Sequence, residues 1–192
     1  DKGNSMQDIY ISGTGVWTPP HKISNKELVE SFNNYVEIFN RENTQKITDG
    51  IVKPLEPSSV DFIEKASGIK NRYVIDKDSL LDPNRMKPMI EARPNDSLSF
   101  CAEISVIAAK EALDNANLNA SDIDAVIVST ANLQRAYPAI AIEVQNELGI
   151  DGYAYDMMVG CSSTTFGISN AYADIASGKA SKVLVINPEI TS

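Results

Sequence analysis

Histidine and cysteine are scarce in this chain of 192 residues, which contains one histidine and two cysteines. Two cysteines at this density do not indicate a disulfide framework, and with a single histidine they cannot supply the ligands of a zinc site. No apolar run approaches the ~20 residues of a membrane helix, and the opening DKGNSMQDIY lacks the apolar core of a signal peptide. We therefore expect no metal, no membrane partner and a reducing, cytoplasmic location.

Positive charge is also in short supply. The formal net charge is −9 and the isoelectric point is near 4.6. This balance argues against nucleic acid or an anionic membrane as the main partner. The apolar fraction of 43% and the charged fraction of 22% are close to those of globular domains, so we expect a folded chain with one good hydrophobic core.

The N-terminal part combines a short strand with a helix. We interpret residues 1–5 as a cloning remnant and Met6 as the natural start. Alternating apolar residues predict a strand over 9–12, and the following glycines and prolines predict a loop that contains His21, to which we assign a surface or structural role. Ser24 and Glu27 have the spacing of a capping box, which predicts that an amphipathic helix starts there.

The region between Arg41 and Pro94 gives a mixed signal. VDFIEKASGIKNRYVI predicts a short helix that ends at Gly68, followed by a strand over 72–75. The stretch from 76 to 94 is charged and rich in proline, which is typical of an excursion over the surface.

From Ser97 onward helical and apolar strand patterns alternate. The helices are expected over 97–116, from Pro138 to Gly149 and from Cys161 to Gly178, and the strands within 123–131, 152–159 and 181–190. This α-β-α-β-α-β order predicts an α/β fold with a mostly parallel sheet covered by helices. The carboxyl ends of the strands then share one edge, where open α/β sheets carry their sites.

Cys161 follows the strand within 152–159 at that edge. Gly160 permits a tight turn from strand to helix, and unpaired N–H groups at a helix start favour a thiolate, the nucleophilic form of cysteine. Free cysteine is nevertheless among the most buried residue types. From the residues alone, Cys161 can be interpreted either as a nucleophile or as a packed core residue. Cys101 lies inside a helix on its apolar face and is expected to be a packing residue.

Four stretches stand in order along the chain: IYISGTGVWTPPHKISNKEL, VDFIEKASGIKNRYV, IDAVIVSTANLQRAYPAIAIEVQNELGI and YDMMVGCSSTTFGISNAY. Together they resemble the 3-oxoacyl-[acyl-carrier-protein] synthase III (beta-ketoacyl-ACP synthase III) family of thiolase-fold condensing enzymes. The resemblance implies a thiolase-like fold of two βαβαβαββ halves. Residues 6–192 would form the N-terminal half, with insertions near 40–55 and 76–94, and the C-terminal half, which brings a catalytic histidine and asparagine, would be absent.

The resemblance also implies a reaction and a set of residues. Cys161 would accept an acyl group from acyl-CoA, and decarboxylative Claisen condensation with malonyl-ACP would follow, with acyl-CoA and acyl carrier protein as partners and no resident cofactor. Phe62, Lys70 and Arg72 would bind CoA, and Tyr137 would reach across a homodimer interface into the neighbouring acyl pocket. The alternatives are that Phe62 is a core residue, that Lys70 and Arg72 are solvated charges and that Tyr137 is an ordinary interface aromatic.

Some residues depart from the family pattern. Ala66 stands where the family often has arginine, and GCSS replaces the usual small-residue and glycine pattern around the nucleophile. These departures suggest longer or unusual acyl groups. Two alternatives remain: ester-forming or hydroxymethylglutaryl-CoA-synthase-like transfer on the same fold, and a non-catalytic half-subunit acting as a scaffold. As a condensing acyltransferase that needs a histidine and an asparagine from the C-terminal half, the isolated 192-residue chain is expected to be inactive.

Overall fold

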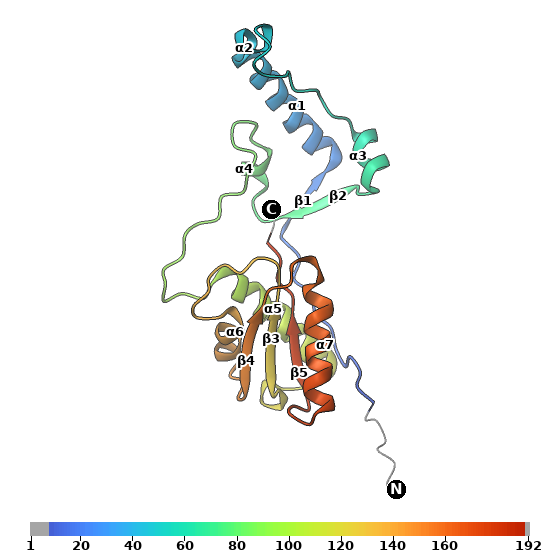
Figure 1. The fold of residues 1–192 in the computed structure, drawn as a ribbon, viewed down its shortest axis with the longest axis vertical. Helices are drawn as coiled ribbons and strands as arrows, with labels where there is room; N and C mark the ends of the chain where they lie inside the picture. Colours follow the sequence, from blue (N-terminus) through green and yellow to red (C-terminus); the bar gives the residue numbers. More distant parts are fainter. Residues whose placement is uncertain (1–7, 191–192) are drawn as a thin grey trace. The chain divides into compact units, whose positions relative to one another are not determined.

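The computed structural model describes residues 8–190, so our interpretation of residues 1–5 and Met6 lies outside the described residues. The described residues form two compact units (Figure 1). The first unit comprises residues 8–17 and 93–190, and the second comprises residues 18–92.

The first unit is an α/β layer structure around a parallel sheet of three strands. Its strands, β3 (Ala125–Ser129), β4 (Tyr153–Met157) and β5 (Val183–Ile186), lie in the order β4-β3-β5. Helices α5 (Phe100–Ala116) and α6 (Ile140–Leu148) pack together on one face, and α7 (Ser163–Ala176) covers the other (Figure 1). Short 3₁₀ turns precede β3 (η1, Ala120–Asp122) and α7 (η2, Gly160–Ser162). The predicted alternation and the parallel sheet are confirmed.

Strand β3 is the centre of the core. It pairs with β4 from Ala125↔Tyr153 to Ser129↔Met157 and with β5 from Ala125↔Val183 to Val128↔Ile186. All of its residues are buried, as expected for an apolar strand covered on both faces. Side chains from α5 and α6, such as Val106 and Val144, complete this core.

All three helices of this unit start later than predicted: α7 begins at Ser163, after turn η2, and capping side chains mark the starts of α5 and α6. Helix α5 begins after Ser99, whose hydroxyl accepts a hydrogen bond from the N–H of Ala102, and not at residue 97 as predicted. Helix α6 begins at Ile140, two residues after Pro138, where both oxygens of Asp156 on β4 accept hydrogen bonds from the first N–H groups at 2.8 Å. A carboxylate in this position satisfies N–H groups that otherwise have no partner in the helix.

The strand predicted over 9–12 is wrong. Residues 8–17 have no regular secondary structure, and β3 pairs directly with β5. Side chains hold this segment to α5 instead: the N–H of Val16 donates to Glu111 at 2.7 Å, and Asn115 donates to the carbonyl of Thr14 at 2.8 Å.

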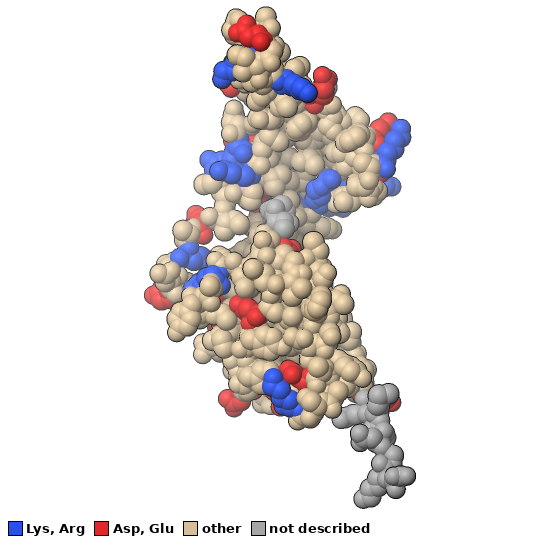
Figure 2. All heavy atoms as spheres, in the orientation of Figure 1, with Lys and Arg blue, Asp and Glu red and all other residues tan. Residues whose placement is uncertain are grey.

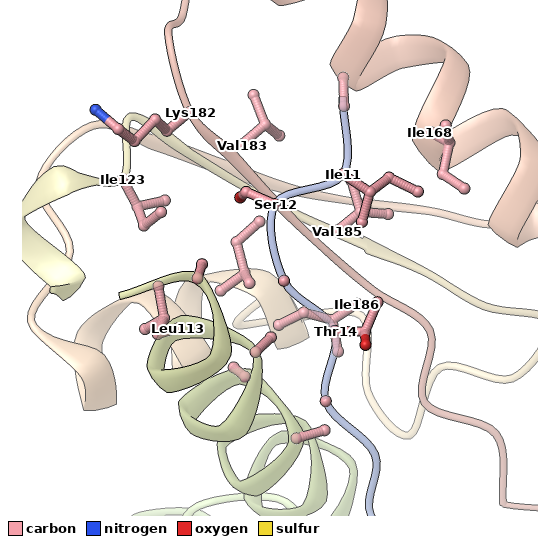
Figure 3. A pocket seen from close by; sticks show the side chains of 18 of the residues that line it. Ile11, Ser12, Thr14, Leu113, Ile123, Ile168, Lys182, Val183, Val185 and Ile186 are labelled. Atoms are coloured by element: carbon pink, nitrogen blue, oxygen red, sulfur yellow. The ribbon is translucent and has the colours of Figure 1, made fainter. Parts of the chain in front are cut away.

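The same segment borders a groove with a volume of about 890 Å³. Ile11 lines this groove with Val185 of β5, Ile168 of α7 and Leu113 of α5 (Figure 3). Hydrogen bonds to α5, and not a backbone ladder or buried side chains, therefore hold residues 8–17 beside the sheet.

The second unit combines one long helix, α1, and three short helices with a two-stranded antiparallel ladder. Its elements are β1 (His21–Ser24), α1 (Asn25–Glu42), α2 (Thr44–Thr48), α3 (Val60–Ser67), β2 (Asn71–Val74) and α4 (Lys77–Leu81). The capping box of Ser24 and Glu27 is present, and α3 ends at Gly68, whose φ of +71° favours glycine, both as predicted. His21 is exposed as expected, but it opens β1 and does not lie in a loop, because it pairs with Val74.

The regions predicted as insertions lie in this second unit. Residues 40–55 hold the end of α1, the short helix α2 and an extended segment. Residues 76–94 hold α4 and then an irregular path with mostly exposed side chains; its last two residues belong to the first unit.

Charge is unevenly distributed over the described surface. Figure 2 shows few charged side chains on the face of the first unit that carries α7. Helix α7 contains one charged residue, Asp174, and exposes Phe166, Ile168 and Tyr172. Within residues 8–190 no helix has the length and apolar character needed to cross a membrane.

Glu27 makes the capping of α1 dependent on pH. Hydrogen bonds from Lys77 and from the backbone and hydroxyl of Ser24 lower the pKa of Glu27 from 4.5 to about 2. A carboxyl group whose pKa is lower in the folded state stabilises the fold above its unfolded pKa. We expect this contribution to be complete above about pH 5 and to be lost as the pH falls towards 2.

An NMR titration of the Glu27 side-chain carboxyl would measure this pKa directly. Lys77→Ala should move the midpoint upward towards the value of an ordinary glutamate, because it removes the largest cause of the shift. A midpoint near 4.5 in the unsubstituted protein would contradict the prediction.

Candidate active site

Cys161 lies at the junction of strand and helix that the sequence predicts. It sits in turn η2, after the carboxyl end of β4 and before the first residue of α7, and its side chain is exposed. Gly160 adopts a φ of +56°, which L-residues with a side chain rarely adopt, so glycine suits this turn. The turn presents the thiol to solvent at the edge of the sheet where the strands end.

A pocket with a volume of about 430 Å³ opens beside Cys161. Its walls come from the ends of all three parallel strands and from the start of α7, a position typical of sites in open α/β folds. The lining residues are Ser129, Ala131, Gly160, Cys161, Ser163, Thr164, Asn187 and Glu189.

Buried hydrogen bonds connect the walls of this pocket. Asn187 donates from Nδ2 to the carbonyl of Ser129 at 2.8 Å, and Ser129 donates from Oγ to the carbonyl of Ser163 at 2.5 Å. Ser129 and Ser163 are both buried. The segments that follow β3 and β5 are thus connected to the turn that carries Cys161.

Glu189 is a second polar feature of the pocket, and the sequence analysis missed it. Its carboxylate accepts hydrogen bonds from Asn132 Nδ2 at 2.7 Å, from Thr130 Oγ1 at 3.1 Å and from the N–H of Ala131 at 3.4 Å. The signal was present, since polar residues directly follow the apolar strands in VSTAN and INPE. Glu189 fixes the start of the loop after β3 against the segment after β5.

Cys101 differs from Cys161 in every respect that matters for reactivity. It is buried in α5, as predicted, and its N–H donates to Oε1 of Gln134 at 2.9 Å. Burial raises the pKa of the Cys101 thiol, with nearby carboxylates adding to the effect. Cys101 therefore remains a protonated packing residue.

Tyr137 lies in the loop between β3 and α6, also in the first unit. Its side chain is 92% exposed. The preceding residues anchor the loop, because Arg135 lies 3.6 Å from the largely buried carboxylate of Glu143 and Gln134 binds the start of α5. The residues before Tyr137 are therefore held in place, while the ring of Tyr137 is exposed to solvent.

The residues assigned to CoA by the resemblance belong to the second unit. Phe62 is 65% exposed on α3, so it is not the core residue of the alternative interpretation. Lys70 is exposed, whereas Arg72 is partly buried and donates from Nη1 to Asn25 Oδ1 at 2.9 Å. Ala66 lies on the exposed surface of the same helix. These side chains and Cys161 belong to different units.

No group of three or more His, Cys, Asp or Glu side chains in the described part of the chain is arranged to hold a metal ion. The candidate chemistry of the first unit is that of an accessible thiol beside a pocket at the edge of the sheet.

Comparisons with known proteins agree with this geometry. Residues 155–192 match the family model of 3-oxoacyl-[acyl-carrier-protein (ACP)] synthase III. The chain is similar to the beta-ketodecanoyl-[acyl-carrier-protein] synthase of Pseudomonas aeruginosa, with 53% identity over 84% of this chain and 46% of the relative.

Solved structures show the same fold. The 3-oxoacyl-[acyl-carrier-protein] synthase III from Aquifex aeolicus superposes with a TM-score of 0.65 and 26% identity, covering 92% of this chain and 43% of that one. OleA from Xanthomonas campestris, solved with lauric acid and lauroyl-CoA, superposes with a TM-score of 0.66 and 20% identity over 96% of this chain and 44% of OleA. The predicted thiolase-like fold is confirmed.

The chain spans about half the length of the curated relatives it matches. Within that span the chain has the fold of the solved 3-oxoacyl-[acyl-carrier-protein] synthase III structures, and its sequence is similar to that family.

Proposed function

We propose that the protein is a condensing acyltransferase in which Cys161 accepts an acyl group from a thioester donor. The observation that carries this proposal is the exposed thiol in a glycine-preceded turn, beside a pocket at the carboxyl edge of a parallel sheet. This turn also lies within the segment that matches the family model.

The reaction proceeds in two stages. The Cys161 thiolate attacks the carbonyl carbon of acyl-CoA, and the tetrahedral intermediate collapses with release of the CoA thiolate, which leaves an acyl group on sulfur. Malonyl-ACP then loses carbon dioxide, and the resulting carbanion attacks the thioester and releases the Cys161 thiolate. A histidine and an asparagine outside this chain stabilise the enolate-like charge by hydrogen bonding.

The acyl donor is of medium length in this proposal. The Pseudomonas aeruginosa relative is named for a beta-ketodecanoyl group. Because condensation with a malonyl unit lengthens the donor by two carbons, a beta-ketodecanoyl product requires an octanoyl donor. Octanoyl-CoA is therefore the first donor to test.

The remaining roles follow the same proposal. Acyl-CoA binds on the second unit, where exposed Phe62 stacks on adenine and Lys70 contacts phosphate. Arg72 already bonds Asn25, which makes it the weaker phosphate ligand of the two. Acyl carrier protein delivers the malonyl group, the protein acts in the cytoplasm without a resident cofactor, and two copies form a homodimer through the loop that carries Tyr137.

The central prediction concerns a covalent adduct. Incubation of the full-length protein with octanoyl-CoA should add one octanoyl group at Cys161, and Cys161→Ala should abolish the adduct because no other exposed thiol is present in the described residues. Intact-mass and peptide mass spectrometry measure this. Cys101→Ala is the matched control and should retain the adduct.

The absence of an adduct on the unsubstituted protein with every acyl-CoA tried would contradict the proposal and favour a scaffold role. Adding malonyl-ACP to the acylated protein separates the reactions, since condensation gives a 3-oxoacyl-ACP and ester-forming transfer does not.

The CoA contact has its own test. Phe62→Ala should raise the half-saturating concentration of octanoyl-CoA about tenfold or more, because base–aromatic stacking contributes roughly 1–3 kcal/mol. Ile51→Ala, a control that truncates another exposed apolar residue of the second unit, should leave it unchanged. If the half-saturating concentration of octanoyl-CoA is the same for the Phe62 variant and the unsubstituted protein, Phe62 does not belong to the CoA site.

A mixing experiment tests whether Tyr137 acts across a dimer. Tyr137→Ala should impair acylation by octanoyl-CoA, and Cys161→Ala should abolish it. Unfolding and refolding the two variants together should restore part of the activity, because a mixed dimer pairs an intact Cys161 with the partner's intact Tyr137. Activity no higher than that of the Tyr137 variant alone would show that Tyr137 does not act in trans.

A further inference from the structure

Ser163 has a buried side chain two residues after the exposed Cys161. Its hydroxyl accepts a hydrogen bond from the N–H of Val159 at 3.1 Å and donates to the carbonyl of Gly160 at 2.8 Å. Both backbone groups lie immediately before Cys161 in the sequence. One side chain thus closes the turn that carries the thiol.

This turn needs such a constraint because of its glycine. Gly160 has φ +56°, and a methyl group added there would contact nothing within 4 Å, so side-chain packing does not restrain this position. Backbone hydrogen bonds from the N–H groups of Ser162 and Ser163 to the carbonyls of Val159 and Gly160 act together with the Ser163 hydroxyl. Glycine has more accessible backbone conformations than any other residue. The Ser163 hydroxyl is therefore a principal polar restraint on the conformation of residues 159 and 160.

The backbone of Ser163 is in turn fixed to the sheet. The buried Ser129 hydroxyl, at the end of β3, donates to the carbonyl of Ser163 at 2.5 Å. One helical turn further on, a methyl group added to Gly167 would lie 3.1 Å from Cβ of Ser129 and 2.9 Å from Cγ1 of Val185. The start of α7 is thus held against β3 and β5.

The neighbouring serine lacks these contacts. Ser162 is exposed, and its side chain makes no capping hydrogen bond to α7. The restraint therefore depends on the hydroxyl at position 163 and is not a general property of a serine-rich turn.

We propose that Ser163 is a positioning residue for Cys161, which fixes the direction of the thiol relative to the pocket. The catalytic importance of this positioning rests on the proposed function. Nucleophilic attack requires reacting atoms about 3–3.5 Å apart in the correct direction. A hydroxyl that restricts the turn before the thiol favours that geometry without touching the substrate.

The test compares two buried serines in the full-length protein. Ser163→Ala should lower the rate constant of Cys161 acylation at saturating octanoyl-CoA by about tenfold, as expected from the loss of one or two hydrogen bonds. The half-saturating concentration should stay within about twofold, since the Ser163 hydroxyl is engaged with backbone groups of the turn. Rapid-quench mass spectrometry measures both quantities.

Ser105→Ala is the matched control. Ser105 is equally buried and its hydroxyl donates to the carbonyl of Cys101 at 2.6 Å, away from the turn. Both variants should lower the melting temperature, but Ser105→Ala should leave the acylation rate constant unchanged. An unchanged rate constant in the Ser163 variant, or an equal loss in the Ser105 variant, would overturn the inference.

Alkylation with iodoacetamide separates this inference from the proposed function. Ser163→Ala should also change the alkylation rate of Cys161, whether or not the thiol accepts an acyl group. If no acyl adduct forms but Ser163→Ala still changes the alkylation rate of Cys161, only the proposed function is refuted. If the variant and the unsubstituted protein are alkylated at the same rate, the positioning role is refuted. If Ser163→Ala does not fold, Ser129→Ala removes the connection to β3 and should also change the alkylation rate of Cys161; an unchanged rate would overturn the inference.

Discussion

Strand β3 is the constraint on which the first unit depends. It pairs along both edges, and its residues are buried by helices on both faces. Each neighbouring strand therefore has its end fixed relative to that of β3, and the segments that follow the three strands meet at one edge. Cys161, Glu189 and the loop after β3 come together because their strands are held in register there. A polar substitution within β3 would leave a buried group without a partner and disturb the whole edge.

The sequence predicts those features that are encoded locally. The capping box of Ser24 and Glu27, the helix ends at Gly68 and Gly149, and the apolar run of β3 each depend on residues close together in the chain. Alternating helix and strand patterns then determine a parallel sheet, and the position of Cys161 at its carboxyl edge follows. Most of the first unit and the location of the candidate nucleophile could therefore be predicted.

Features that depend on partners distant in the sequence could not be predicted in this way. The start of α6 depends on Asp156, which follows sixteen residues after Ile140, and the closure of the pocket depends on Ser129 meeting Ser163 across 34 positions. The segment 8–17 has a strand-like pattern, but the hydrogen bonds that hold it go to side chains of α5, distant in the sequence, and not to a neighbouring strand. Residue patterns show which side chains are polar, but only the fold shows which of them meet.

The contrast between the two thiols has a practical consequence for measurement. Because Cys161 is exposed and Cys101 is buried, a maleimide dye or a spin label should attach at one position without any substitution in the described chain. Such a label would sit in the mouth of the pocket and report on whatever enters it. The protein thus carries a built-in attachment point for a spectroscopic probe at the place where its chemistry is expected.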